Sequence, residues 1–209
     1  MNEVLQIHLL DIDNTRDLSI LAKKLEMLAE PNAIACNNWP EYTKQLPVSS
    51  FRIARTANEL LVLFTTEGLD ELRAENTAEQ SPVSQDSCVE AFIEPVPGGE
   101  YWNFELNSNG ALNSSHRKER PAPVRLDAEQ LAAVRRLAIK GENNAWKLLL
   151  AIPLEMLMLE NAGKAYRFRA NFYCTSSRSR NPYYLSWAPI TTEKPDFHLP
   201  RFFGEAVFA

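Results

Sequence analysis

Two aspartates near the start of the sequence have a spacing that suits phosphoryl transfer. Residues 9–15 read LLDIDNT, so Asp11 and Asp13 follow an apolar stretch that predicts a short strand. Side chains two residues apart on a strand point to the same side, which lets one carboxylate attack phosphorus while the other transfers the proton. A second apolar stretch, Leu61–Thr66, ends in a hydroxyl residue, which the same chemistry also uses.

The segment resembles the first motif of haloacid-dehalogenase-type phosphatases, but the rest of the sequence does not supply the other parts. That chemistry needs further acidic residues to hold Mg²⁺, and the nearest pair, Asp86 and Glu90, falls where the pattern predicts antiparallel strands. The fold also needs a parallel sheet with crossover helices, which the second half does not predict. An Asp/Asn-rich turn after a strand is therefore favoured, and a phosphatase using Asp11 and Asp13 remains an alternative.

The histidines and cysteines do not indicate a metal or cofactor site. His8, His116 and His198 lack the spacing of metal ligands, and no glycine-rich phosphate loop is present. Cys88 and Cys174 fall on predicted strands, where buried thiols are favoured over a disulfide. No cofactor is predicted from these residues.

Strands dominate the elements that must position any site. The second half lacks the strand–helix alternation of a parallel sheet, so we predict an all-β fold, a β-sandwich with one or two short peripheral helices. One helix is expected after Asp17, and another over 128–139 behind a capping box at Asp127. The whole chain, 1–209, is expected to be one domain, with 1–34 as an N-terminal strand and helix extension. The predicted strands are Val4–Leu10, Phe51–Arg55, Leu60–Thr66, Leu72–Glu75, Cys88–Glu94, Tyr101–Asn107, Trp146–Ile152, Ala165–Cys174, Tyr183–Trp187 and Glu205–Phe208.

Composition and charge exclude several kinds of partner. The 209 residues contain 22 Lys and Arg against 27 Asp and Glu, a net charge of −5. Nucleic-acid binding needs a basic face, so no nucleic-acid partner is predicted. No stretch approaches the roughly 18 apolar residues that cross a bilayer, so no membrane partner is predicted. The first ten residues lack the features of a signal peptide, which leaves the cytoplasm or a mature exported form as the expected location.

Three blocks of sequence, in a consistent order, resemble one family. Residues 84–93 read SQDSCVEAFI, and residues 101–107 read YWNFELN. The third block runs from NFYC at 171–174 through YLSWAPI at 184–190 to PDFHLPRFFG at 195–204. Over residues 35–209 the chain resembles the family 9-like carbohydrate-binding modules of the single-domain type found in gut Bacteroidetes. The resemblance implies a jelly-roll-like β-sandwich that binds an oligosaccharide or glycan end without catalysis. It implies no cofactor and is compatible with structural Ca²⁺, for which no ligands are assigned.

The resemblance also implies a set of sugar-binding residues. In that family two aromatic side chains clamp the terminal sugar, while carboxylate, arginine and amide groups bond its hydroxyls. Sugar rings present apolar C–H faces for stacking and hydroxyls at their edges, which explains both kinds of group. The residues implied here are Glu90, Arg117 or Arg120, Asn103, Trp187, Phe202 and Phe203.

One departure from the family pattern concerns the aromatic clamp. Members commonly place an aromatic residue six positions before the glutamate, where this chain has Ser84. Trp39 or Tyr42 from the long loop can take that place. Trp187 and Phe203 can instead be core anchors. Glu90 with Arg117 or Arg120 can likewise be a structural ion pair.

Two further functions stay open on the sequence alone. Glu90 and Glu105 lie on neighbouring predicted strands, where paired carboxylates can serve a glycosidase if they are about 5–5.5 or 6.5–9.5 Å apart. Related sandwich domains bind haem through methionine and histidine, and Met156, Met158 and His198 are available for this.

Overall fold

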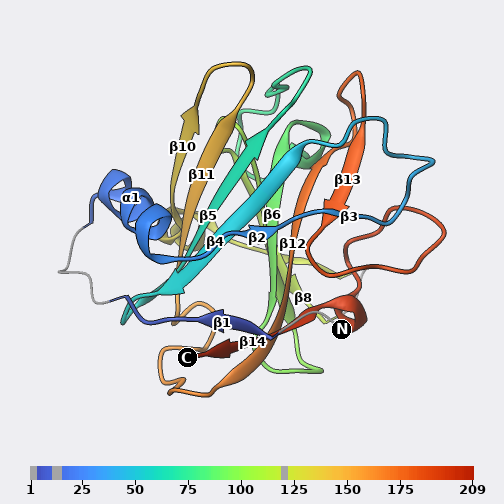
Figure 1. Ribbon diagram of the computed structural model, residues 1–209. Helices are drawn as coiled ribbons and strands as arrows, with labels where there is room; N and C mark the ends of the chain where they lie inside the picture. The colour runs from blue at the N-terminus through green and yellow to red at the C-terminus, as the bar shows by residue number, and fades with distance from the viewer. Residues whose placement is uncertain (1–3, 11–15, 119–121) are drawn as a thin grey trace.

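The chain folds into two β-sheets packed face to face, as seen in a computed structural model that describes residues 4–10, 16–118 and 122–209 (Figure 1). Within these residues the larger sheet has nine strands and the smaller sheet has five. The larger sheet contains, from edge to edge, β1 (Leu5–Ile7), β14 (Gly204–Phe208), β12 (Arg167–Ser176), β6 (Cys88–Glu94), β7 (Tyr101–Asn107), β8 (Leu112–Arg117) and β9 (Val124–Arg125), while β13 (Tyr183–Ser186) pairs with β12 and with β3 (Cys36–Asn37). The smaller sheet contains β10 (Arg135–Lys140), β11 (Trp146–Pro153), β5 (Glu59–Glu67), β4 (Val48–Arg55) and β2 (Asn32–Ala33).

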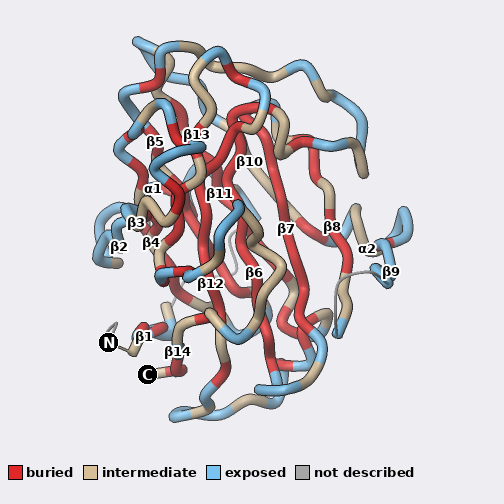
Figure 2. The backbone as a smooth tube through the Cα atoms, turned by 90° about the vertical axis from the view of Figure 1, so that its right-hand side faces the viewer, coloured by how far each residue is buried: buried red, intermediate tan, exposed pale blue. Residues whose placement is uncertain are grey.

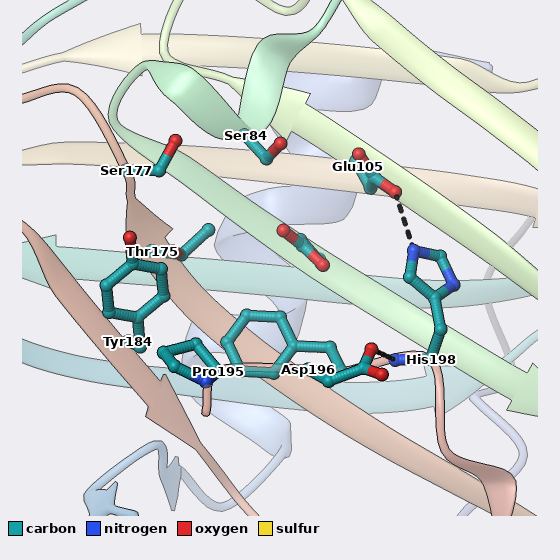
Figure 3. Close-up of a pocket in the computed structure, with 10 residues that line it drawn as sticks. Ser84, Glu105, Thr175, Ser177, Tyr184, Pro195, Asp196 and His198 are labelled. Atoms are coloured by element: carbon teal, nitrogen blue, oxygen red, sulfur yellow. Dashed lines mark hydrogen bonds and ion pairs between the residues drawn. The ribbon is translucent and has the colours of Figure 1, made fainter. Parts of the chain in front are cut away.

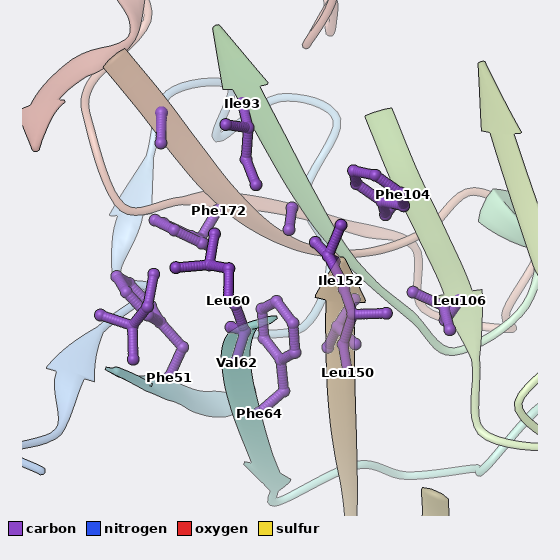
Figure 4. Packing of buried hydrophobic residues seen from close by; sticks show 14 of the residues in the cluster. Phe51, Leu60, Val62, Phe64, Ile93, Phe104, Leu106, Leu150, Ile152 and Phe172 are labelled. Carbon is purple, nitrogen blue, oxygen red and sulfur yellow. The ribbon is translucent and has the colours of Figure 1, made fainter. Parts of the chain in front are cut away.

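The core lies between the two sheets. Because side chains alternate along a strand, every second residue of β6, β7 and β12 points toward the smaller sheet. Figure 4 shows Ile93, Phe104 and Phe172 from the larger sheet facing Phe51 and Val62 from the smaller one. The rings of Phe51 and Phe172 stack with their centroids 3.8 Å apart, so the two sheets are in direct aromatic contact.

A helix covers the outer face of the smaller sheet. α1 (Leu18–Leu28) begins at Asp17, whose carboxylate accepts hydrogen bonds from the backbone N–H groups of Ser19 and Ile20. The helix lies beside β10 and β11 in Figure 1. Its buried residues Leu21, Ala22 and Leu25 pack on Leu61, Leu63, Leu149 and Ala151.

The outer face of the larger sheet is covered in another way. The segment 187–203 crosses it, and aromatic residues of that segment pack on aromatic residues of the strands. In Figure 2 the strand β7 is coloured as buried along its length, although only one of its faces points toward the smaller sheet. The residues of β6 and β7 that face away from the smaller sheet are therefore buried by other segments, among them 187–203 and the stretch 76–86.

The structure confirms the predicted all-β sandwich with short peripheral helices and corrects some of the predicted elements. The helix predicted over 128–139 ends early: α2 (Ala128–Ala133) keeps its capping box, and Arg135–Lys140 forms β10. The backbone of β10 pairs with β11, so sheet hydrogen bonds outweigh the local helical pattern. The stretch 72–75 is not a strand.

The N-terminal segment contributes β1 to the larger sheet and α1 to the cover of the smaller sheet. β1 pairs in parallel with β14, with Leu5 opposite Ala206 and Ile7 opposite Phe208.

Cys88 and Cys174 are buried free thiols, and burial raises the pKa of the Cys174 thiol to about 11. Across the described residues, neither helix has the length and apolar character needed to span a bilayer.

Candidate functional site

A cavity of about 200 Å³ lies on the outer face of the larger sheet, under the segment 187–203 (Figure 3). The strands and the covering segment each supply part of its wall. In Figure 3, Ser84, Ser177 and Glu105 lie on one side, and Tyr184, Pro195 and Asp196 lie on the other. The lining residues are Ser84 from the 3₁₀ turn η1 (Val83–Gln85), Glu90, Glu105, Thr175, Ser177, Tyr184, Pro195, Asp196, Phe197 and His198.

Two glutamates form the floor of the cavity. Glu90 on β6 is directly opposite Glu105 on β7, and both point away from the smaller sheet. Side chains directly opposite on one face of an antiparallel pair have Cβ atoms about 4.5–5.5 Å apart, so the two carboxyl groups are neighbours. Glu90 is 2% exposed and Glu105 is 6% exposed. Burial, together with the charge of Glu105, raises the pKa of Glu90 well above its usual range, so Glu90 is the member of the pair that keeps its proton.

Glu105 is held in place by its neighbours. Its Oε1 accepts a hydrogen bond from the Asn103 amide at 3.0 Å, and its Oε2 accepts one from the Asn113 amide at 2.9 Å. The Nε2 atom of His198 lies 3.8 Å from Oε1. These contacts fix the position of the Glu105 carboxyl group next to Glu90.

Glu90 differs from Glu105 in that its carboxyl group has no hydrogen-bond partner among the described residues, although it is almost fully buried. Buried polar groups in proteins nearly always have a partner, and leaving one without a partner costs about 1–3 kcal/mol. Because the carboxyl group lines the cavity, a bound ligand can supply the missing hydrogen bond.

His198 is fixed at the edge of the cavity. Its Nδ1 lies 3.0 Å from the Tyr101 hydroxyl, and its ring packs on Phe92 with centroids 4.8 Å apart. Its backbone N–H donates to the Asp196 carboxylate at 3.0 Å. These contacts hold the turn 196–198 against the sheet and bring Phe197 to the cavity.

The aromatic part of the wall consists of Phe197 and Tyr184. The Phe197 ring stacks on Tyr173 with centroids 4.1 Å apart and an angle of 11° between the planes, and the Tyr173 hydroxyl donates to the Phe197 carbonyl. Trp39 supports Phe197 from a centroid distance of 5.7 Å, and its indole N–H donates to the Thr192 carbonyl. Both Phe197 and Tyr184 are only partly buried, so each presents apolar ring surface at the cavity.

Ser84 lines the cavity at the position where the family resemblance leads us to expect an aromatic residue. Ser177 lies on the same wall, and its N–H donates to the Ser84 carbonyl at 3.0 Å, whereas Thr175 lies beside Tyr184 (Figure 3). Of the two proposed replacements, Trp39 is buried behind Phe197 and Tyr42 is not part of the lining. This wall therefore offers hydroxyl groups and no aromatic surface.

Three polar residues expected at the site have different positions in the structure. Glu90 lines the cavity. Asn103 lies beneath it, where its amide holds Glu105, and Arg117 donates to the Asn103 oxygen at 3.2 Å without lining the cavity. Arg117 thus bonds Asn103 and not Glu90, and Arg120 lies outside the described residues.

The three expected aromatic residues do not line the cavity. Trp187 packs edge-on against Phe51 and Phe172, each at a centroid distance of 5.9 Å. A Cβ atom at Gly204 would lie 2.5 Å from the Trp187 ring, so only glycine fits there. Phe203 is buried against Tyr101 and Phe92, and the Phe202 ring lies under the guanidinium of Arg201.

Tyr184, Phe197 and His198 are cavity residues that the sequence did not single out for sugar binding. All three fall in the third sequence block, and the stretch PDFH at 195–198 contains the signal that was available. An aspartate two residues before a turn N–H commonly caps that turn, which predicts that 196–198 is fixed. The sequence does not indicate that this turn lies over β6 and β7.

Of the alternative functions, the structure brings the glycosidase pair Glu90 and Glu105 side by side, and it keeps the residues proposed for haem binding apart. Asp11 and Asp13 lie outside the described residues. For haem binding, Met156 packs against the core between the sheets and Met158 is 65% exposed, whereas His198 lies on the outer face of the larger sheet. The described residues contain no group of three or more His, Cys, Asp or Glu side chains placed to hold a metal ion.

Comparisons with known proteins agree with this architecture. A structure from Bacteroides uniformis, described as a carbohydrate-binding protein candidate, is 28% identical with a TM-score of 0.89, and the match covers 99% of each chain. A carbohydrate-binding module of family 9 from Caldicellulosiruptor kristjanssonii, solved with glucose, has a TM-score of 0.63 at 12% identity and covers 99% of this chain and 96% of that one. The same kind of module solved with cellotriose has a TM-score of 0.60 at 11% identity, with 99% and 93% covered.

Among curated proteins there is no significant match. The sequence model of carbohydrate-binding family 9, in contrast, matches residues 19–208. This range contains all three sequence blocks and every residue that lines the cavity. The chain therefore belongs to carbohydrate-binding family 9, as the three blocks predicted.

Proposed function

We propose that this protein binds the end of a glycan, without cleaving it, in the cavity on the outer face of the larger sheet. The observation that carries the proposal is the Glu90 carboxyl group, which is buried, faces the cavity and has no hydrogen-bond partner among the described residues. A sugar hydroxyl can bond to it and remove the cost of leaving it without a partner.

The other walls suit a sugar ring. Phe197 and Tyr184 present ring surface that can pack against the apolar C–H face of a sugar, and Ser84 and Ser177 offer hydroxyls to its edge. Pockets for drug-sized ligands measure about 300–1,000 Å³, so a cavity of about 200 Å³ suits one ring and not a long chain. The related module structures contain glucose and cellotriose, which are ligands of this class.

Asn103 and Arg117 act as positioning residues in this proposal. Arg117 donates to the Asn103 oxygen, and Asn103 in turn donates to Glu105. The chain of bonds fixes Glu105 next to Glu90, and the charge of Glu105 helps to keep the proton on Glu90. A protonated carboxyl group can both donate to and accept from sugar hydroxyls.

The same contacts favour binding over hydrolysis. A retaining glycosidase pairs a protonated acid with a carboxylate that attacks the sugar. Both oxygens of Glu105 already accept hydrogen bonds from Asn103 and Asn113, which ties this carboxylate to its neighbours.

The proposed binding uses no cofactor, and structural Ca²⁺ is not part of it. Its partner is an oligosaccharide end, not nucleic acid or a membrane, and residues 1–209 act as one binding unit.

A calorimetric titration with a panel of sugars tests the proposal. The panel contains neutral, amino and acidic monosaccharides and short oligosaccharides, with the folded wild-type protein at millimolar sugar. We expect binding of at least one sugar, and a loss of about tenfold in affinity in E90A, since the hydrogen bonds lost with the carboxyl group contribute about 1.5 kcal/mol. The matched control is E67A, which truncates an exposed carboxylate at the end of β5. An absence of binding across the panel would refute the proposed function, and release of an aryl group from aryl glycosides would refute its non-catalytic part.

A further inference from the structure

The walls of the cavity carry acidic groups that are not balanced by basic ones. Glu90, Glu105 and Asp196 all line it. Among the described lining residues there is no lysine or arginine, and the one residue that can become cationic, His198, is in contact with Glu105. The charge that faces a ligand is therefore negative.

The three carboxyl groups differ in what they already bond. Glu105 accepts from the amides of Asn103 and Asn113, and Asp196 accepts from the His198 backbone N–H. Glu90 is 2% exposed and has no hydrogen-bond partner in the described part of the chain. Glu90 is therefore the group that remains available to a cationic ligand inside a negative cavity.

We propose that the cavity selects a sugar with a free, positively charged amino group, such as a 2-amino-2-deoxyhexose, and that the ammonium group of this sugar bonds to Glu90. The inference rests on the proposed function. An ammonium group has three N–H donors, and a charge-assisted hydrogen bond is about twice as strong as a neutral one. An acidic sugar would place its own carboxylate beside those of Glu105 and Asp196, and the repulsion between like charges is expected to make it the weakest ligand.

Binding of an amino sugar should release a proton from the protein, whereas binding of a neutral sugar should not. Before binding, burial and the adjacent Glu105 keep a proton on Glu90 by raising its pKa. An ammonium group in contact favours the carboxylate, so the proton leaves Glu90 and passes to the buffer. Other titratable groups surround Glu90 and come from β6, β7, β12, β13 and the covering segment. All of them are neutral or negative except His198, which is in contact with Glu105. They are Cys88, Tyr101, Glu105, Tyr173, Cys174, Tyr184, Asp196 and His198.

Calorimetry with four sugars tests the inference: glucosamine, N-acetylglucosamine, glucose and glucuronic acid. At about pH 6 an amine is charged because its ordinary pKa is near 8. Titrations in two buffers of different ionisation enthalpy count the protons released. We expect glucosamine to bind at least about tenfold more tightly than glucose or N-acetylglucosamine, with glucuronic acid weakest, and only glucosamine to release a proton.

Two variants locate the preference. E90Q is expected to bind glucosamine no more tightly than glucose and to release no proton, whereas E67Q, which makes the same substitution at an exposed residue outside the cavity lining, keeps the wild-type order. Circular dichroism and thermal melting confirm that both are folded. If glucose binds as tightly as glucosamine, or if both release the same number of protons, the inference is wrong and the proposed function stands. If none of these four binds but another sugar of the panel does, the inference is wrong and the proposed function stands; if no sugar of the panel binds, the proposed function itself is wrong.

Discussion

The outer faces of the two sheets are both covered, but they are built from opposite kinds of residue. On the smaller sheet, Leu61, Leu63 and Leu149 point outward and are sealed by α1. On the larger sheet, Glu90 and Glu105 occupy equivalent outward positions under the segment 187–203, and a cavity remains above them. The same alternation of side chains thus yields a mainly apolar layer under a helix on one side and a polar cavity under a loop on the other.

The difference shows where the fold gains stability and where it gives stability up. Burying a leucine side chain stabilises a protein by about 1.5–3 kcal/mol, so the layer under α1 contributes to the free energy of unfolding. Burying a carboxyl group without a partner opposes folding. Glu90 therefore lowers the stability of the empty protein, a cost that the proposed sugar ligand would offset.

The largest expected effect comes from placing a carboxyl group on the side covered by α1. L149E would bury a carboxyl group whose directly opposite residues, Leu63 and Leu137, are both apolar. A fully buried carboxyl shifts by about 3–5 pKa units, so we expect the free energy of unfolding to fall by roughly 4 kcal/mol. Urea unfolding measures this, with L149M as a control of similar volume. A cost below that of L149M would mean that the two faces do not differ as described.

A second test uses the pH dependence of stability. Below about pH 4 both the folded and unfolded states hold the Glu90 proton. As the pH rises, the unfolded state releases it first because the pKa of Glu90 is raised in the folded state. The unfolding free energy of the wild type should therefore fall relative to E90Q by up to about 1.4 kcal/mol per pH unit, until the pH passes the folded-state pKa. Urea unfolding of both proteins from pH 4 to 8, with E67Q as the control, measures the difference. A constant difference would contradict the raised pKa.

A third test separates the cavity from the aromatic residues nearby. F197A removes ring surface that faces the cavity, so we expect the affinity for the bound sugar to fall by about 1 kcal/mol, or roughly fivefold. F202A removes a ring of the same segment that lies outside the lining, and its affinity should stay within about twofold of wild type. Titration calorimetry compares the two. Equal losses would favour the family-based assignment of Phe202 to the site over the cavity.

The smallest expected effect concerns the wall that lacks an aromatic ring. S84W would place a ring opposite Phe197 and should strengthen the binding of a neutral sugar by about 0.5–1 kcal/mol. S84A, which removes only a hydroxyl, serves as the control and should change the affinity by less than about 0.5 kcal/mol. Weaker binding by S84W than by S84A would show that the cavity has no room for the second ring.

The long strands could be predicted because each contains its own pattern. Alternation in β4, β5, β6, β7 and β12 and the apolar run of β11 follow from burial on one or both faces. β8 was missed because its sequence, LNSSHR, has few residues that favour strands; it exists because β7 offers a partner. β10 was wrongly predicted as part of a helix because its own sequence has a helical pattern, while its pairing with β11 cannot be seen in that sequence.

The candidate site was only half predictable for a related reason. Glu90 was identified through the family resemblance, but its burial depends on the covering segment and could not be predicted from its strand. Phe197 and His198 reach the cavity because contacts with Tyr173 and Tyr101, remote in sequence, fix the covering segment. Trp187 was expected at the site because tryptophan suits sugar stacking, yet the same large ring suits the core, and Gly204 makes room for it there.

The parallel pairing of β1 with β14 has a mechanical consequence. The two strands run in the same direction, with Gln6 opposite Val207, and the Ala209 N–H donates to the Ile7 carbonyl at 3.0 Å. They lie side by side at the bottom of Figure 1. A pull on the chain before β1 and after β14 acts along the strands in opposite senses, so the bonds between them are loaded together in shear and not opened one at a time. When force is applied to both ends of the chain, the pairing of β1 with β14 would therefore be the part of the fold that resists unfolding first.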